Sequence, residues 1–305
     1  MSPNVSVILP TYNRATLLRA AVDALLRQTA QADAYEIVAV DNNSSDGTAE
    51  LLASFDDRRV VVVKEPRQGL SYARNAGLAA ARGDILALTD DDVEVAPDWI
   101  DTIITTMTAH QDVDAVGGRV LPAWPDEKPS WLTRTHWAPL ALQDHGDTNR
   151  VFDRSSPIGL IGANVAFRRA VFERVGTFSP AVQRVRDGIG STEDHELLHR
   201  VYASGGRALY TPHMIAMTRV PRERCARAYH RRWHAGHGFF HALMRTDDVE
   251  HSRVHVLGVP GHLLRGAATD AARWAACAAR GDWDGAFDAE LRLRFFGGFL
   301  KGRMS

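Results

Sequence analysis

The sequence predicts an α/β fold, a mostly parallel central sheet flanked by helices, followed by a helical C-terminal extension. In the first 120 residues, short apolar β-branched runs alternate four times with segments of helical period. This alternation implies right-handed crossovers and a sheet covered on both faces. Beyond about residue 247 the chain is rich in Ala and Arg, which favours helix.

The individual elements follow from this pattern. We expect strands at residues 5–9, 36–41, 60–64 and 85–89, and helices at 15–27, 48–55 and 70–81. A further helix follows Pro97, and regularity returns at 161–168, in a helix at 193–204 and in a strand at 208–211. The predicted division of the chain is into residues 1–120, 121–245 and 246–305, of which the last is the helical extension.

Residues 121–157 break the regular pattern with five prolines and three tryptophans among polar residues. A connection of this length is either packed on the body by its aromatics or is a substrate-facing lid, because long irregular loops are uncommon unless functional. We expect this segment and residues 184–191 to border an acceptor site. Gly188 and Gly190 flank one residue there, which allows the backbone to change conformation easily.

Composition excludes several classes of protein. The 36 Lys and Arg against 37 Asp and Glu give a net charge of −1, which argues against a nucleic-acid partner. Two cysteines are too few for a disulfide framework. No apolar run reaches the roughly 18–20 residues that span a bilayer, and no signal peptide is visible. We therefore expect a cytoplasmic protein.

Polar clusters follow three predicted strands, at the edge where α/β sheets bind ligands. They are Pro10-Thr11-Tyr12-Asn13-Arg14, Asp41 with the residues after it, and Asp90-Asp91-Asp92. Simpler interpretations exist: Asn13 as a helix cap, and Asp46-Gly47 as an ordinary turn. The first strand is not followed by a Gly-x-Gly-x-x-Gly motif, and no Gly-Lys-Ser/Thr loop occurs. The sequence therefore lacks the phosphate-binding motifs of nicotinamide-dependent and P-loop enzymes, and both classes are disfavoured.

The three consecutive aspartates suggest a cation site. Like charges at a strand end are unfavourable unless a cation or hydrogen-bond donors compensate. Asp90 and Asp92 face the same way if strand geometry persists, and hard oxygen ligands suit Mg²⁺ or Mn²⁺ held together with substrate phosphates. The alternative is a solvated acidic turn before the Pro97 helix.

Together these motifs are similar to those of the family 2 glycosyltransferases of GT-A fold. The resemblance rests on VILPTYNR, VDNNSSDGT, SYARNAG and LTDDD, and continues in GANVAFRR, VGTF and TEDHEL. It covers roughly residues 4–235 and fades beyond them. It implies a GT-A domain in which residues 1–120 bind the nucleotide sugar and residues 121–245 form the acceptor-binding and catalytic half. Each motif is short, but their order along the chain matches that of the family.

The resemblance implies a role for each matching residue. A nucleotide-diphosphate sugar, expected to be UDP-linked, would be the donor, with Mn²⁺ or Mg²⁺ as cofactor and a glycan or lipid-linked acceptor. Asp194 would be the general base, and Asp92 the metal ligand. The donor-binding residues would be Pro10, Thr11, Tyr12, Asn13, Arg14, Asp41, Arg74, Asp90 and Asp91, and the acceptor side would be formed by Gly162, Asn164 and Glu193. From position alone, Asp194 could equally be a first-turn helix acid.

Two features depart from or extend the family pattern. Many relatives carry a histidine where this chain has Thr218, which puts the completeness of the metal site in doubt. The arginine-rich stretch 219–234 and the Phe/Arg tail 292–303 predict loose binding to an anionic membrane surface. A solvated helix face, or contact of the arginines with the donor diphosphate, are the alternatives. His230, His234, His237 and His241 follow helical spacing, but lack the carboxylate or cysteine partners of a zinc site.

Two other functions remain open from the sequence. A nucleotidyltransferase could use a similar acidic sheet edge, would need no base at Asp194, and would release pyrophosphate rather than a nucleoside diphosphate. A non-catalytic glycan-binding relative would retain the fold alone, and the intact Asp-x-Asp and Glu-Asp pairs disfavour it.

Overall fold

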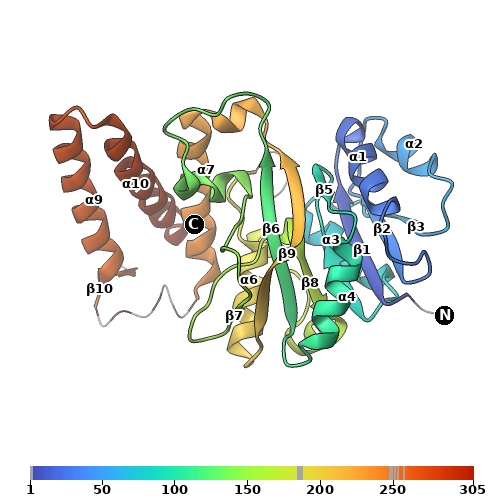
Figure 1. Ribbon diagram of the computed structural model, residues 1–305. Coiled ribbons are helices and arrows are strands. Elements are labelled where there is room, and N and C mark those ends of the chain that lie inside the picture. Colours follow the sequence, from blue (N-terminus) through green and yellow to red (C-terminus); the bar gives the residue numbers. More distant parts are fainter. Residues whose placement is uncertain (1–2, 184–187, 247–249, 251, 253, 257) are drawn as a thin grey trace. The chain divides into compact units, whose positions relative to one another are not determined.

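The structure is a computed structural model that describes residues 3–183, 188–246, 250, 252, 254–256 and 258–305 (Figure 1). It divides into two compact units. Unit 1 comprises Met1–Trp124, Ala141–Pro180 and Glu193–Arg219, and unit 2 comprises Pro125–Leu140, Ala181–Thr192 and Val220–Ser305. Residues 125–140 pack with the C-terminal helices in unit 2. The division into three functional segments stays a prediction.

Unit 1 contains the predicted alternation of strands and helices. Its first half runs β1 (Val5–Thr11), α1 (Ala15–Leu26), β2 (Tyr35–Asp41), α2 (Thr48–Ala53), β3 (Val60–Lys64), α3 (Leu70–Ala80), β4 (Ile85–Leu88), β5 (Val93–Val95) and α4 (Trp99–Ala109). Its second half adds β6 (Ala115–Ala123), β7 (Arg150–Phe152), β8 (Val165–Arg168), α5 (Arg169–Val175), α6 (Glu193–Ala203) and β9 (Ala208–Arg219). The predicted α/β class is confirmed.

The sheet order is β3-β2-β1-β4-β8-β6-β9-β5, with β7 paired to β9. Strands β3, β2, β1 and β4 are parallel, whereas β8 is antiparallel to both β4 and β6. The chain leaves β1 toward β2 and β3 and then returns to place β4 on the other side of β1. The point where the order reverses therefore lies between β1 and β4, beside the predicted polar clusters.

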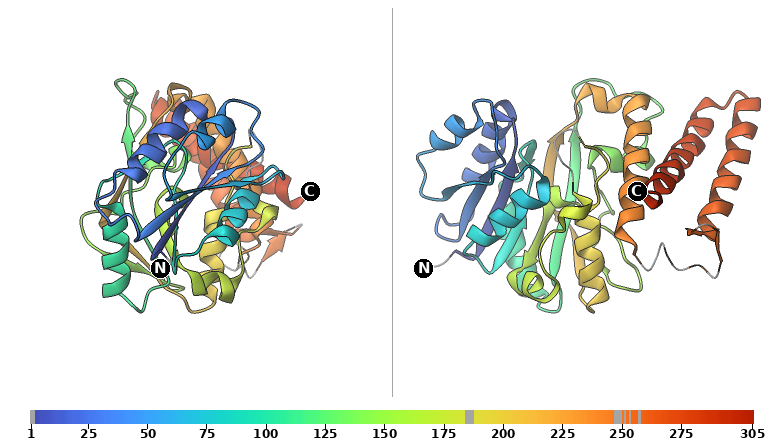
Figure 2. Two further views of the ribbon diagram at one scale, coloured as in Figure 1. Left: turned by 90° about the vertical axis from the view of Figure 1, so that its right-hand side faces the viewer. Right: turned by 180° about the vertical axis from the view of Figure 1, so that it is seen from behind.

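Helices cover both faces of this sheet, as predicted. α1 and α4 face the viewer in Figure 1, and α3 and α6 face the viewer in the rear view of Figure 2. The α3–α6 side packs on the strands through buried apolar side chains, among them Ile8, Val40, Leu78, Leu197 and Val201. Gly77 of α3 permits close approach, because a Cβ there would lie 2.6 Å from a methyl group of Ile8.

Unit 2 is mainly helical, with α7 (Arg227–Met244), α9 (Gly261–Ala279) and α10 (Trp283–Arg303), a short β10–β11 pair (His255–Val256, Val259–Pro260), and short 3-10 turns. The predicted helical C-terminal extension is thus present. None of the helices among the described residues is both long and apolar enough to cross a bilayer.

The Trp/Pro-rich connection is packed by its aromatic residues over residues 125–140. The Trp131 ring meets His136, His230 and Phe287 edge-on, with centroids 5.0–5.2 Å apart. This packing supports the first of the two interpretations for that part of the connection. Of the predicted acceptor-side segment 184–191, residues 184–187 lie outside the described part of the chain. The role of this segment as a moving border of the site stays a prediction.

The arginine-rich stretch is divided between two elements. Arg222 and Arg224 lie in a 3-10 turn before α7, and Arg227, Arg231 and Arg232 belong to the helix. Arg227 lies 4.7 Å from the centroid of the Phe287 ring, and Arg231 forms an ion pair with Glu290 at 2.8 Å. These two arginines therefore make contacts within unit 2.

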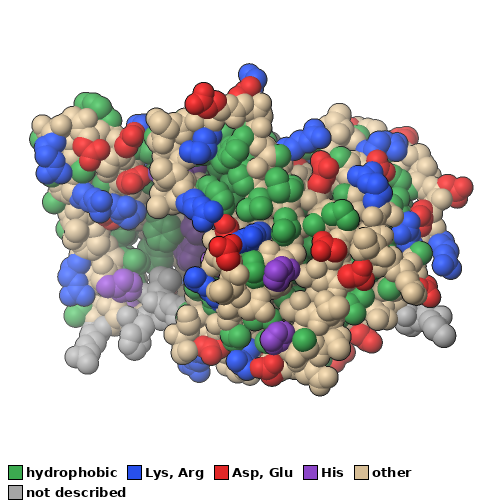
Figure 3. All heavy atoms as spheres, in the orientation of Figure 1, with side chains coloured by type: hydrophobic (Ala, Val, Ile, Leu, Met, Phe, Trp, Pro, Cys, Tyr) green, Lys and Arg blue, Asp and Glu red, His purple; other side chains and the backbone are tan. Residues whose placement is uncertain are grey.

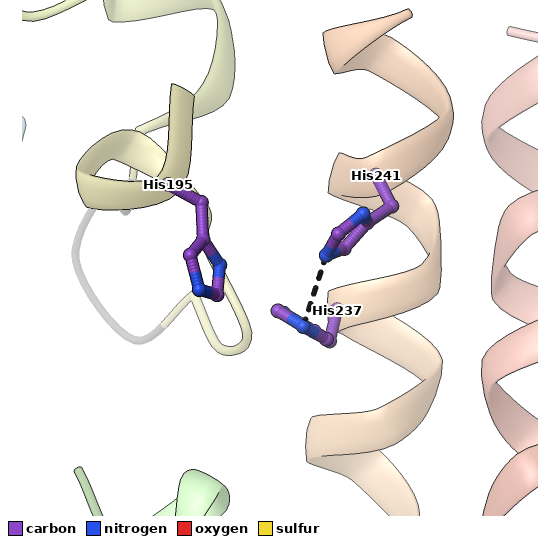
Figure 4. A group of neighbouring side chains, drawn as sticks. All are labelled: His195, His237 and His241. Carbon is purple, nitrogen blue, oxygen red and sulfur yellow. Dashed lines mark hydrogen bonds between the residues drawn. The ribbon is translucent and has the colours of Figure 1, made fainter. Parts of the chain in front are cut away.

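Histidines at helical spacing lie on α7, while His195 belongs to α6 of unit 1 (Figure 4). His237 and His241 are one turn apart, and their Nε2 atoms are 3.1 Å from each other. His237 also stacks on Trp233, with ring centroids 4.3 Å apart. The histidine pair is thus held by contacts along its own helix.

Candidate active site

The loops that follow β1 and β2 are fastened to each other at the switch point. The Asn13 side-chain oxygen accepts from the Ser45 N–H at 2.7 Å, and the Asn13 N–H donates to Ser44 Oγ at 3.0 Å. Asn13 has φ of 52°, and α1 begins only at Ala15, so Asn13 links two loops and does not cap the helix. Asp41 is buried, and its Oδ1 accepts from the Ser44 N–H at 3.0 Å.

The register of the strands brings the first two predicted clusters together. Thr11 of β1 pairs with Asp41 of β2, so both residues end their strands at the same level. Pro10 and Thr11 are buried, whereas Tyr12 is partly exposed after the strand end. Asp46 forms the expected turn, with its Oδ1 accepting from the Thr48 N–H at 3.0 Å.

The three aspartates after β4 occupy two different environments. The Asp90 and Asp92 side chains are 29% and 14% exposed. Asp91 is buried, and its carboxylate accepts from Thr11 Oγ1 at 2.7 Å. Burial, followed by the negative charge of Asp92, raises the pKa of Asp91 to about 7. This placement favours a supporting role for Asp91 behind the edge, instead of the direct donor contact expected from the resemblance.

Asp92 is held by two neighbours. Arg14 Nη1 lies 3.3 Å from Asp92 Oδ2, which joins the first and third predicted clusters. Thr218, at the position where the family resemblance leads to the expectation of a histidine, donates from Oγ1 to the Asp92 carbonyl oxygen at 3.3 Å. The nearby His213 is exposed on β9. Thr218 therefore contacts the backbone of the predicted metal ligand and offers no imidazole.

Arg74 of α3 connects the donor-side and base-side carboxylates. It is fully buried, with its Nη1 2.5 Å from Asp194 Oδ1 and its Nη2 3.5 Å from Asp90 Oδ1. Glu193 Oε1 lies 3.6 Å from the same Nη1. Burial alone would lower the pKa of Arg74, but the charges of Asp194, Asp90 and Glu193 together raise it above its ordinary value. The guanidinium also lies 5.3 Å from the Phe178 ring centroid.

Asp194 lies in the first turn of α6 with both carboxylate oxygens engaged. Oδ1 accepts from Arg74, and Oδ2 accepts from the Gly162 N–H at 2.9 Å. A Cβ on Gly162 would lie 2.6 and 2.7 Å from the two oxygens, so no larger residue fits there without displacing the carboxylate. Asp194 is thus both a first-turn helix acid and an oriented, partly exposed carboxylate.

Asn164 is placed inside the fold. It is fully buried, its amide nitrogen donates to the carbonyl oxygens of Arg119 and Met214, and its oxygen accepts from Trp99 Nε1 at 2.7 Å. The amide group is therefore used in holding the loop before β8. Of the predicted acceptor-side residues, Gly162 and Glu193 lie beside Asp194, and Asn164 acts behind them.

The sequence missed the connection that organises this site. The resemblance placed Arg74 among the donor-binding residues, and the structure shows its guanidinium against Asp194 and Asp90. Contact of Arg74 with the donor stays a prediction. The sequence also did not assign Thr218 or Phe178 a contact with the site residues. A signal for Phe178 was available, since it belongs to the VGTF segment that the resemblance includes.

The residues present fit a divalent cation. Asp92 and Asp90 supply hard carboxylate oxygens, partly exposed at a sheet edge, of the kind that Mn²⁺ and Mg²⁺ prefer. The pairing of Asp92 with Arg14 already shows that this carboxylate binds positive charge.

The topology and the acidic edge at the switch point define an α/β domain of the GT-A class. Within that class, the chain belongs to glycosyl transferase family 2, whose sequence profile matches residues 6–176. The GT-A expectation and the family resemblance are both confirmed.

Curated proteins are similar to about two thirds of the chain. The chain is 29% identical over 215 residues to a glucosyl-dolichyl phosphate glucuronosyltransferase of Haloferax volcanii, which covers 68% of this chain and 66% of that protein. It is also 29% identical to the succinoglycan biosynthesis protein ExoO of Rhizobium meliloti, covering 69% of this chain and 59% of that one. The chain thus spans less than two thirds of the length of these relatives.

Solved structures with similar folds cover nearly the whole chain. The mannosyltransferase PcManGT of Pyrobaculum calidifontis, in complex with GDP-Man and Mn²⁺, matches with a TM-score of 0.64 at 24% identity, covering 99% of this chain and 87% of that one. TarS of S. aureus, in complex with UDP-GlcNAc, matches with a TM-score of 0.57 at 16% identity, covering 95% and 90%. At these identities the likeness shows the fold.

Proposed function

We propose that the protein is an inverting, metal-dependent glycosyltransferase that moves a sugar from a nucleotide-diphosphate donor to a hydroxyl of a glycan or lipid-linked acceptor. The observation that carries this proposal is the linked set of carboxylates: Asp90 and Asp92 at the donor edge, and Asp194 oriented by Arg74 and Gly162. Family membership and the nucleotide-sugar complexes of the structural neighbours support the donor class. A UDP-linked sugar is the donor that we propose.

In this proposal Asp194 is the general base. A hydroxyl is a weak nucleophile at neutral pH, so a one-step displacement needs a positioned group to accept its proton. Arg74 and the Gly162 N–H fix the carboxylate of Asp194 in one orientation, which lowers the entropic cost of reaching the reactive geometry. Attack from the side opposite the leaving nucleotide inverts the anomeric centre.

The donor side would be held by the edge of β1, β2 and β4. Asp41 and the Tyr12–Arg14 segment are proposed to contact the nucleoside, Asp90 the donor ribose or sugar, and Asp92 the metal. When bound, Mn²⁺ or Mg²⁺ supplies positive charge against the developing charge of the leaving diphosphate. Arg14, already 3.3 Å from Asp92, adds a second positive group at that place.

A thermal-shift screen tests the donor assignment. A ligand present at 100 times its Kd stabilises the folded state by about 2.7 kcal/mol, so a matching nucleoside diphosphate with Mn²⁺ should raise the Tm by several degrees. Asp92→Asn should lose most of this shift, whereas substitution of Asp153, in an exposed turn of unit 1, should retain it. Absence of any nucleotide-dependent shift with the wild-type protein would contradict the proposal.

Product analysis separates the proposal from nucleotidyl transfer. A glycosyltransferase releases a nucleoside diphosphate, and donor hydrolysis or transfer can be followed by that product. Release of pyrophosphate in its place would identify a nucleotidyltransferase, while donor binding without turnover toward any acceptor would favour a glycan-binding role.

We also propose peripheral association with the cytoplasmic face of an anionic membrane. Much of the arginine stretch is engaged within the units, since Arg222 pairs with Asp126 and Arg231 with Glu290. The support therefore comes mainly from the Phe/Arg tail on α10. Co-sedimentation with anionic vesicles that weakens as salt rises is the expected result. Equal sedimentation with neutral and anionic vesicles would contradict an electrostatic attachment.

A further inference from the structure

An apolar groove runs along the helices of unit 2. It has a volume of about 950 Å³ and is lined by α7, α9 and α10, at the upper end of the range typical of small-molecule sites. Phe239, Trp274 and Leu293 supply most of the large apolar side chains. Gly297 leaves part of the wall low, since a Cβ there would meet no atom within 4 Å. The lining is therefore suited to a hydrocarbon chain.

One rim of this groove is positively charged. Arg294 and Lys301 of α10 line it, and residues 292–303 of that helix include four cationic side chains and no acidic one. Glu290, the acidic residue in the lining, is neutralised by Arg231 at 2.8 Å and Arg294 at 3.0 Å. Figure 3 shows Lys and Arg side chains over α9 and α10 at the left of the view. A single anionic group at the end of an apolar ligand would complement this rim.

Exposed apolar side chains gather in the same part of the chain. Of the ten large hydrophobic side chains that are exposed among the described residues, six belong to residues 243–304: Leu243, Val254, Val256, Trp274, Trp283 and Met304. Two of them are tryptophans, which are favoured where an apolar phase meets water. Trp274 is 45% exposed although it lines the groove, which leaves its indole available to a ligand.

We propose that this groove binds the hydrocarbon chain of a lipid-linked acceptor, with the phosphate group of that lipid at Arg294 and Lys301. The identity of the occupant as an acceptor rests on the proposed function, while binding of the chain can be measured without any transfer. A second copy of the protein fits less well, because it would bring the same cationic rim against this one. Charge complementarity therefore favours an anionic amphiphile.

The glycines provide a variant that blocks the groove without disturbing the fold. A Cβ on Gly297 would meet no atom within 4 Å, and Gly297 lines the groove, so the larger side chain of Gly297→Phe would extend into it. Gly266 on α9 is equally open but does not line the groove, which makes Gly266→Phe the matched control. Lys301→Gln removes one rim charge, and Arg273→Gln on α9 is its control.

Calorimetric titration of the full chain with short-chain probes tests the proposal. A C15 isoprenyl phosphate should bind at least tenfold more tightly than the C5 phosphate or the C15 alcohol. Gly297→Phe should weaken C15 phosphate binding at least tenfold, while Gly266→Phe leaves it unchanged. Lys301→Gln should weaken binding of the C15 phosphate and not of the alcohol, because the charge acts on the phosphate alone, and Arg273→Gln should alter neither.

Two results would overturn the proposal. Equal affinity of Gly297→Phe and the wild-type protein for the C15 phosphate would remove the groove as its site. If the wild-type protein is a dimer, Gly297→Phe is a monomer and neither binds the lipid, the groove would be assigned to self-association. The nucleotide-dependent Tm shift of Gly297→Phe separates this test from the proposed function. The nucleotide-dependent Tm shift of Gly297→Phe should equal that of the wild-type protein. If neither protein shows this shift, the donor assignment is refuted, but the proposal that the groove binds lipid is not.

Discussion

Asp91 makes the stability of the protein depend on pH in a direction opposite to that of an ordinary ion-paired aspartate. Its carboxyl group is 9% exposed, and burial with the nearby Asp92 raises its pKa to about 7, against 3.8 for an unperturbed aspartate. Between these two values the folded state holds a proton that the unfolded state has released. The stabilisation is therefore fully present below pH 3.8 and is lost as the pH rises toward 7.

The size of this effect follows from the two pKa values. With 1.36 kcal/mol per pH unit, the contribution of Asp91 falls by about 2–3 kcal/mol between pH 5 and pH 8. Asp91→Asn keeps the shape and a hydrogen bond with Thr11 but removes the titration. The free energy of unfolding of the variant, relative to that of the wild-type protein, should thus rise by about 2–3 kcal/mol when the pH changes from 5 to 8.

Urea unfolding at both pH values, in EDTA so that no divalent ion is bound, measures this difference. Asp98→Asn at the start of α4 is a control, since its carboxylate makes no side-chain cap bond there. A stability difference between Asp91→Asn and wild type that is the same at pH 5 and pH 8 would refute the assignment of a buried, protonated Asp91.

Three further substitutions test the site itself. Gly162→Ala should lower the free energy of unfolding by about 1–3 kcal/mol and the transfer rate more than tenfold, because the added methyl group meets the Asp194 carboxylate. Gly47→Ala is the control, since its Cβ would meet nothing within 4 Å, and it should leave the free energy of unfolding and the transfer rate near their wild-type values. Asp92→Asn should weaken calorimetric binding of the nucleoside diphosphate in Mn²⁺ at least tenfold, and unchanged affinity would exclude it as a ligand. Arg74→Lys should lower kcat by tenfold or more, because a compact ammonium cannot contact Asp194 and Asp90 together, and wild-type turnover would contradict its bridging role.

Local pattern was sufficient to predict the first half of the fold. The apolar runs at 5–9 and 36–41 became β1 and β2 because buried parallel strands are continuous and apolar, and the helices between them carry a clear 3.6-residue period. Regular structure at 161–168 and a strand at 208–211 were expected, but the antiparallel direction of β8 and the extension of β9 to Arg219 were not, since strand direction and length there depend on pairing with β4 and β6 far along the chain. The packing of residues 125–140 with α7 and α10 is likewise a tertiary effect.

The sequence was sufficient to predict which residues form the candidate site, but not the contacts between them. Sequence order placed the polar clusters at strand ends, and the shared level of Thr11 and Asp41 follows from parallel register. The burial of Asp91 and of Asn164 could not be read from the sequence, because it depends on which side of the strand end faces Thr11 and Trp99. The bridge from Arg74 to Asp194 joins residues 120 positions apart.

Turnover by Asp194→Asn tests the central claim most directly. The substitution preserves shape and hydrogen-bonding capacity but removes basicity, so transfer should fall by about 10²–10⁴-fold while donor affinity remains near the wild-type value. Glu193→Gln, at the neighbouring position beside Arg74, is the matched control and should retain most activity. Wild-type turnover by Asp194→Asn, or loss of transfer in Glu193→Gln alone with donor binding intact, would show that Asp194 is not the base.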